Sequence, residues 1–113
     1  SEILIHYTTE NGYKSIMESK QLLPSVGIKH ARYGDGQYFT DLNSIDYTVG
    51  QLSRRLYRVP WNKSHLTHFI KINVSGLNII KNGPHNFLLP NNQPLNLNNR
   101  IVGGGVSIFK IKF

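Results

Sequence analysis

The segment Arg32–Asp41 (RYGDGQYFTD) holds the densest group of residues that could bind a ligand. Gly34 and Gly36 permit a close approach of backbone to ligand, and Tyr38 offers a ring that can stack on a planar group. The two glycines form neither a phosphate-binding loop nor a dinucleotide GxGxxG motif, because no helix follows at the required spacing. Composition alone favours a simpler interpretation, the start of a β-hairpin with Tyr38 packed in the core.

A second candidate is His6, which lies in the apolar run Ile3–Thr8 (ILIHYT). A single histidine in such a run is more often a hydrogen-bonded core residue than a functional one. Tyr7 and Thr8 follow directly, so backbone groups and a hydroxyl stand beside the imidazole. These three residues are therefore candidates for hydrogen bonding to a polar ligand.

Metal-dependent and nucleophilic catalysis find little support. The chain has no cysteine, which excludes disulfides, zinc–thiolate sites and thiol nucleophiles. His65 and His68 lie where a loop leads into a strand, so their side chains point to opposite faces. Neither HExxH nor GxSxG is present. Asp35 and Asp41 are the weakest alternative, a carboxylate pair for hydrolysis.

Charge is distributed unevenly along the 113 residues, which carry 13 Lys and Arg against 6 Asp and Glu, a net charge of +7. Every acid lies within the first 46 positions: Glu2, Glu10, Glu18, Asp35, Asp41 and Asp46. This asymmetry indicates an anionic partner, although a basic face that only aids solubility explains it equally well. The basic and aromatic stretch Arg54–Lys63 suits nucleic acid, but a helix C-terminus followed by a packed loop fits slightly better.

Apolar spacing and turn formers predict two helices among several strands. Residues 3–8 favour a strand, and Thr9 caps a helix that ends near Lys20. Residues 21–35 form a loop, and residues 36–41 form the next strand.

The second predicted helix begins at Asn43 or Ser44 and carries apolar residues at helical spacing: Ile45, Val49, Leu52 and Leu56. Beyond it we expect a loop over 57–66, strands at 68–74 and 77–81, a loop over 82–99, and closing strands at 100–102 and 106–113. In the last strand Ser107, Phe109, Ile111 and Phe113 share one face. This order predicts one α+β domain over residues 1–113, with two small sheets facing each other across a cleft. No apolar run approaches the roughly 20 residues that span a bilayer, so no membrane partner is expected.

Three segments together resemble the ADP-ribosyltransferase superfamily, most closely the small toxin domains with a His-Tyr-Asp signature in its poly(ADP-ribose)-polymerase-like branch. The first is Leu4–Thr8 (LIHYT). The second is Ala31–Asp41, similar to a polymerase strand that ends in Tyr-Phe-Ala-Asp. The third is Asn98–Val102 with the closing strand, similar to a strand in which Asn-Glu precedes Tyr-Ile-Val. The resemblance spans nearly the whole chain, and its first two motifs are fairly specific.

The resemblance implies an ADP-ribosyltransferase-like split β-sheet core with two short helices around an NAD-binding cleft. It implies that His6 and Tyr38 face each other across that cleft, with His6 on a ribose of NAD+ and Tyr38 stacked on the nicotinamide. The remaining implied NAD contacts are the Tyr7 backbone and Thr8 hydroxyl on the carboxamide, Arg32 on the pyrophosphate, Tyr47 as a second stacking face, and Gly36 and Ser44.

The third catalytic position departs from the family pattern. A carboxylate that binds the ribose 2′-hydroxyl is usual there, whereas Asn99 occupies the position here and Asn96 is the neighbouring alternative. An asparagine offers no full charge to an oxocarbenium-like transition state, a loss of roughly 10²–10³ in rate. Three explanations stay open: Asp35 or Asp41 supplies the charge, the protein works slowly or on another reaction, or an acid has been replaced to give an inactive protein.

The activity that the resemblance implies is cleavage of the nicotinamide bond of NAD+ and mono-ADP-ribosyl transfer to an acidic protein or RNA. NAD+ hydrolysis is one alternative, and a non-catalytic module that binds NAD+, ADP-ribose or nucleic acid is another. NAD is the substrate, and no metal is expected. A toxin of this kind acts in the cytosol of a target cell, is delivered within a larger secreted polypeptide, and has an immunity protein as a further partner.

Overall fold

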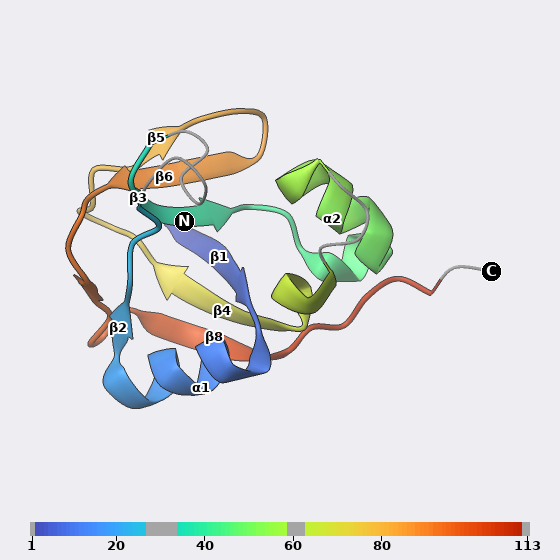
Figure 1. The fold of residues 1–113 in the computed structure, drawn as a ribbon, viewed down its shortest axis with the longest axis horizontal. Coiled ribbons are helices and arrows are strands. Elements are labelled where there is room, and N and C mark those ends of the chain that lie inside the picture. The colour runs from blue at the N-terminus through green and yellow to red at the C-terminus, as the bar shows by residue number, and fades with distance from the viewer. Residues whose placement is uncertain (1, 27–33, 59–62, 112–113) are drawn as a thin grey trace.

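The computed structural model describes residues 2–26, 34–58 and 63–111, and most of the strands in this part of the chain form one antiparallel sheet. Its order is β5-β6-β3-β1-β4-β8 (Figure 1). The strands are β1 (Ile3–Thr8), β3 (Gly36–Thr40), β4 (His68–Asn73), β5 (Ile80–Lys81), β6 (Asn86–Pro90) and β8 (Ile101–Val106). A separate two-stranded ribbon joins β2 (Gln21–Leu22) to β7 (Leu95–Asn96).

The large sheet is divided between β1 and β3. β1 pairs with β4 along its whole length, and β3 does the same with β6. Between β1 and β3, the described register holds the single pair Ile5↔Thr40. In Figure 1, β6 and β3 run across the view, whereas β1 and β4 run obliquely to them. The two small sheets expected from the sequence are thus two differently oriented halves of one sheet.

The helices cover opposite faces of this sheet. Helix α1 (Glu10–Ser19) begins at Thr9, whose hydroxyl accepts a hydrogen bond from the Gly12 amide, and helix α2 (Val49–Tyr57) begins at Thr48 with a capping box. Because side chains alternate along a strand, β1 contributes to two cores. Its even positions pack against α1, and its odd positions pack against α2 and the short 3₁₀ helix η2 (Lys63–Leu66).

The N-terminal expectations are confirmed and the second helix is corrected. The strand at 3–8 and the helix from Thr9 to Lys20 are both present. The second helix is divided into the 3₁₀ helix η1 (Ser44–Asp46), capped by Asn43, and α2. The cause is Tyr47, whose extended backbone (φ −137°, ψ 152°) separates the two pieces.

The second half of the chain holds more strand than the sequence indicates. The segment 82–99 contains β6 and β7, because its apolar residues are drawn into the sheet despite the surrounding asparagines and prolines. The two closing strands are a single strand, β8, which runs through the three glycines. At Gly104 a Cβ would lie 2.9 Å from the Phe69 carbonyl oxygen and 3.2 Å from the Tyr13 ring, so glycine permits this close packing.

Three smaller expectations differ as well. The strand expected at 77–81 is limited to β5. Residues 107–111 do not form a strand. Ser107 and Phe109 are still half-buried between exposed neighbours, whereas Ile111 is exposed and Phe113 lies outside the described residues. Within the described ranges, neither helix is long and apolar enough to cross a membrane.

Candidate functional site

His6 lies where the sheet divides, directly beyond the pair that joins β1 to β3. Its Nδ1 donates a hydrogen bond of 2.9 Å to the backbone carbonyl oxygen of Tyr38. A carbonyl oxygen only accepts, so the proton of the neutral ring is on Nδ1 and a lone pair stays on Nε2. Burial lowers the pKa of His6, and the hydrogen bond to Tyr38 opposes this only in part. The imidazole is therefore a neutral group with one fixed tautomer.

The structure differs from the expected meeting of two rings. The His6 ring lies edge-on to the Phe39 ring, with centroids 6.4 Å apart. Neighbouring residues of a strand point to opposite faces, so the Tyr38 ring lies on the other face of β3. There its hydroxyl donates to the carbonyl oxygen of Gly34. His6 and Tyr38 thus meet through the Tyr38 backbone, at the gap between the two halves of the sheet.

His6 also borders a cavity of about 370 Å³, which we call the α1 cavity. Its lining combines apolar residues with hydroxyl and amide groups, and most of it comes from α1 and β2: His6, Gly12, Ser15, Ile16, Ser19, Gln21, Leu22 and Leu23. A space of this size with a few polar groups suits one end of a nucleotide.

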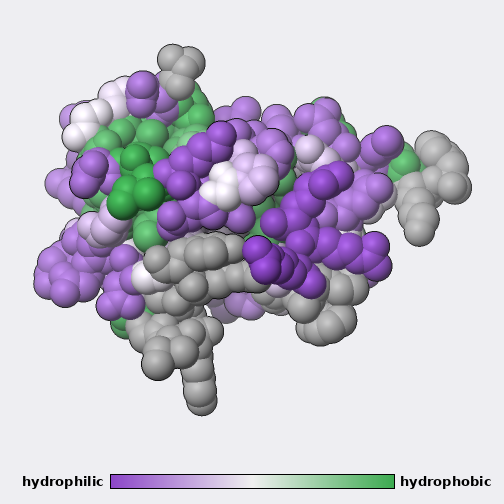
Figure 2. Space-filling view, turned by 90° about the horizontal axis from the view of Figure 1, so that it is seen from above, coloured by the Kyte–Doolittle hydropathy of each residue, from purple (hydrophilic) through white to green (hydrophobic). Residues whose placement is uncertain are grey.

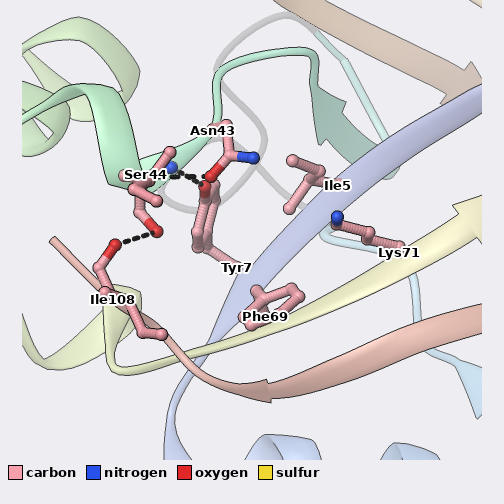
Figure 3. A pocket seen from close by; sticks show the side chains of 8 residues that line it. Ile5, Tyr7, Asn43, Ser44, Phe69, Lys71 and Ile108 are labelled. Atoms are coloured by element: carbon pink, nitrogen blue, oxygen red, sulfur yellow. Dashed lines mark hydrogen bonds between the residues drawn. The ribbon is translucent and has the colours of Figure 1, made fainter.

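A smaller cavity of about 110 Å³, the Tyr7 cavity, opens on the opposite face of β1 (Figure 3). Its lining comes from β1, β4, η1 with its capping residue Asn43, and the C-terminal segment: Ile5, Tyr7, Asn43, Ser44, Ile45, Phe69, Lys71 and Ile108. Because Tyr7 and His6 are neighbours on β1, the two cavities flank that strand.

Hydrogen bonds hold the wall of the Tyr7 cavity in place. The buried Tyr7 hydroxyl donates to the Leu42 carbonyl oxygen and accepts from the Ser44 amide, both at 2.8 Å. The Ser44 hydroxyl donates to the Ile108 carbonyl oxygen at 2.8 Å (Figure 3). Burial is the main cause that raises the pKa of Tyr7, and the charge of Asp46 adds a smaller contribution in the same direction. The Tyr7 hydroxyl is therefore a neutral structural link.

We expect Tyr7→Phe to lower the free energy of unfolding by about 1–3 kcal/mol, since it leaves a buried carbonyl and a buried amide without their partner. Chemical denaturation measures this cost. Tyr57→Phe is the matched control: burial raises the pKa of Tyr57 to about 12, and no bond of its hydroxyl to a described residue exists, so its loss should be nearly neutral. Equal costs for the two changes would contradict the structural role of the Tyr7 hydroxyl.

The other sequence-predicted binding residues are spread around this region. Tyr47 packs against the buried cluster that contains Tyr7 and Leu52. The Arg55 guanidinium lies 4.8 Å from the centroid of the Tyr47 ring. Thr8 ends β1 and is half-buried. Gly36 begins β3 at the far end of the gap. Arg32, expected at the pyrophosphate, lies outside the described residues.

The structure does not bring Asn99 to His6. Asn99 is exposed in the turn before β8, with a left-handed φ of 64°. The register places Ile101 opposite Ile72, near the start of β1, so Asn99 lies beyond that end of the sheet. Asn96 is also exposed, and its Oδ1 accepts two hydrogen bonds from Asn98, at 2.9 and 2.8 Å.

Among the acids, Asp41 is already engaged by His85, whose Nδ1 lies 2.9 Å from the Asp41 carboxylate. Asp35 is exposed beside Gly36. Asp46 was not anticipated: it ends η1 directly after Ser44 and Ile45, and its charge acts on Tyr7. Asp46 is exposed and lines neither cavity, so its charge reaches Tyr7 only from outside the cavity wall.

Sequence reasoning also missed Phe69 and Lys71, which line the Tyr7 cavity from β4. The signal was present in the alternation of the predicted strand at 68–74, which places these two residues on one face. The missing piece was the pairing Ile5↔Lys71 and Tyr7↔Phe69, which brings that face beside β1. Among residues 2–26, 34–58 and 63–111, no group of three or more His, Asp or Glu side chains is placed to hold a metal ion.

Residues 4–101 match a family model described as an HYD1 signature containing ADP-ribosyltransferase. The matched range includes the strands that line the two cavities and the segment Gly34-Asp35-Gly36. No curated protein and no solved structure matches the chain significantly.

Proposed function

Because the chain belongs to the ADP-ribosyltransferase toxin domains that contain the HYD1 signature, we propose that it cleaves NAD+ and transfers one ADP-ribose to a macromolecular acceptor. The observation that carries the proposal is His6, held in one tautomer at the gap of the split sheet and bordering the α1 cavity. Its Nε2 can accept a hydrogen bond from a ribose hydroxyl, and its neutral state adds no repulsion to the positive charge that develops on the sugar.

In this proposal the nicotinamide enters the Tyr7 cavity, beside Tyr7 and Ser44, and His6 contacts a ribose from the division of the sheet between β1 and β3. The C1′–N bond breaks, and its electron pair leaves with nicotinamide, which becomes neutral. The acceptor then forms the new bond to C1′ and loses its proton. Stacking and exclusion of water favour this step.

Asp46 is our candidate for the negative charge that Asn99 lacks. It is exposed and lines neither cavity, but it follows the cavity residues Ser44 and Ile45 directly, whereas Asn99 lies beyond the far end of the sheet and Asp41 is held by His85. A carboxylate near the ribose stabilises the oxocarbenium-like state through space.

The acceptor class that the charge distribution supports is an acidic protein or RNA. Helix α2 carries Arg54 and Arg55 in its last turn, and the right-hand part of the molecule, on the side of α2, is largely hydrophilic in Figure 2. In this proposal the chain acts as a toxin domain in the cytosol of a target cell, carried within a larger secreted polypeptide and countered by an immunity protein.

The test is to incubate the purified chain with NAD+ labelled in the adenylate and a cell lysate. We expect release of nicotinamide and a labelled macromolecule, which protease or RNase treatment assigns to protein or RNA. Free ADP-ribose without a labelled macromolecule would indicate hydrolysis instead. Binding of NAD+ without nicotinamide release would identify a non-catalytic module, and no binding at all would refute the proposal.

A further inference from the structure

Lys71 is the charged residue in the lining of the Tyr7 cavity. It lies on β4 directly opposite Ile5, and its side chain is half-buried. Figure 3 shows the Lys71 side chain extending from β4 beside Ile5. None of the NAD+ contacts proposed above involves Lys71.

Two neighbours give the Lys71 side chain its direction. Gly103 is its partner on β8, and the lysine stem runs along it: a Cβ at Gly103 would be in ordinary van der Waals contact with Lys71 Cδ, at 3.8 Å. The ammonium nitrogen lies 6.0 Å from the centroid of the Phe69 ring, which also lines the cavity. The stem thus packs on the sheet while the charge stays at the cavity.

No carboxylate neutralises this charge in the described part of the chain. The ion pairs found there are Lys14 with Glu10 and His85 with Asp41. The cavity around Lys71 is mostly apolar, with Ile5, Phe69 and Ile108 among its walls. Attraction between opposite charges is stronger next to such walls than in bulk water, so an anionic ligand atom gains most at this place.

We propose that Lys71 is an anion-binding residue that holds a phosphate oxygen of the dinucleotide whose nicotinamide enters the Tyr7 cavity. This inference rests on the proposed function. The nicotinamide ring of NAD+ is itself cationic, so Lys71 does not attract it; the anionic atoms of the ligand are its phosphate oxygens. Lys71 then orients the ligand by drawing the pyrophosphate toward the cavity mouth while the ring faces Tyr7.

The experiment measures binding by calorimetry with two probes, ADP-ribose and nicotinamide. Lys71→Met should weaken ADP-ribose binding about 10- to 100-fold, the usual effect of losing a hydrogen bond to a charged group, and leave nicotinamide binding unchanged. Lys71→Arg should restore most of the affinity. In the wild type, added salt should weaken ADP-ribose binding more steeply than in Lys71→Met.

Lys81→Met is the matched control. Lys81 also lies beside a phenyl ring, with its ammonium 5.9 Å from the Phe87 centroid, but it is on β5 at the other edge of the sheet and lines neither cavity. Its loss should not change either affinity. Thermal melts verify folding, and if Lys71→Met fails to fold, Lys71→Gln replaces it.

Two results would overturn the inference while leaving the proposed function intact. The first is unchanged ADP-ribose affinity in a folded variant without the Lys71 charge. The second is an equal loss of nicotinamide affinity, which would place Lys71 at the ring instead of the phosphates. A wild-type protein that binds neither NAD+ nor ADP-ribose would refute the proposed function itself.

Discussion

Replacing His6 with alanine should lower the rate of nicotinamide release from NAD+ by roughly 10²-fold or more. The imidazole is positioned by its bond to the Tyr38 carbonyl oxygen, 2.9 Å away, so Nε2 needs no reorganisation to meet a ribose hydroxyl. Alanine removes both the acceptor and the link across the divided sheet. Steady-state kinetics with purified NAD+ measures the loss.

Two further variants separate a ligand contact from a structural effect. His65→Ala removes an exposed histidine from η2 and should leave turnover near the wild-type value. His6→Gln retains polar groups of similar reach. It should therefore be more active than His6→Ala, mainly because its KM is lower than that of the alanine variant. Full turnover in a folded His6→Ala protein would contradict the proposed role.

The lowered pKa of His6 predicts a pH dependence of stability. Below pH 6.5 the unfolded chain takes up a proton at His6 that the folded protein does not, so stability present above pH 6.5 is lost as the pH falls toward the folded pKa. His6→Ala lacks this contribution. The difference in free energy of unfolding between wild type and variant, measured by denaturation at about pH 7.5 and about pH 5.5, should therefore shrink at the lower pH. A difference that is the same at both pH values would contradict the assignment.

Local signals in the sequence were sufficient for β1 and α1. Thr9 is an N-cap residue before an apolar helical pattern, and the run Ile3–Thr8 is a clear strand. The family assignment drew on the same region, together with the Gly-Asp-Gly segment that leads into β3, and the family match confirms it.

Long-range pairing limited what could be predicted of the rest. β8 passes through three glycines, which usually end a strand, because Gly104 fits beneath Tyr13 and Gly103 lies opposite Lys71. These contacts join segments that are far apart in the chain, so local sequence patterns do not reveal them. The same holds for the Tyr7 cavity, whose walls come from four separated segments, and for the opposite directions of the His6 and Tyr38 side chains, which follow from the pair Ile5↔Thr40.

Gly36→Ala should destabilise the protein by roughly 3–5 kcal/mol, a large part of the 5–15 kcal/mol typical of a domain. The first cause is conformational, because φ at Gly36 is +152°. The second is steric: a Cβ would lie 2.1 Å from the Leu89 carbonyl oxygen, which belongs to the backbone of β6 and cannot turn away. Gly36 also exchanges two backbone hydrogen bonds with Ser25, so any shift disturbs both sides of the strand.

Substitutions at two other glycines separate the conformational cost at Gly36 from the steric cost. Gly34 has φ +119° but nothing within 4 Å of an added Cβ, so Gly34→Ala should show the conformational cost alone, about 1–3 kcal/mol. Gly50 lies in α2 with open space around it, and Gly50→Ala should stabilise by about 0.5–1 kcal/mol.

The cost at Gly36 should reach the proposed site as well. Gly36 begins the strand whose Tyr38 carbonyl oxygen fixes His6, so a displaced β3 shifts the acceptor that sets the imidazole tautomer. Under conditions where Gly36→Ala is still folded, NAD+ turnover should fall with a higher KM, whereas Gly50→Ala should keep the wild-type kinetics. Equal stability of the Gly36→Ala and Gly34→Ala proteins would show that the β6 backbone moves to accommodate the added methyl group. Normal NAD+ turnover in Gly36→Ala would show that His6 does not depend on the position of β3.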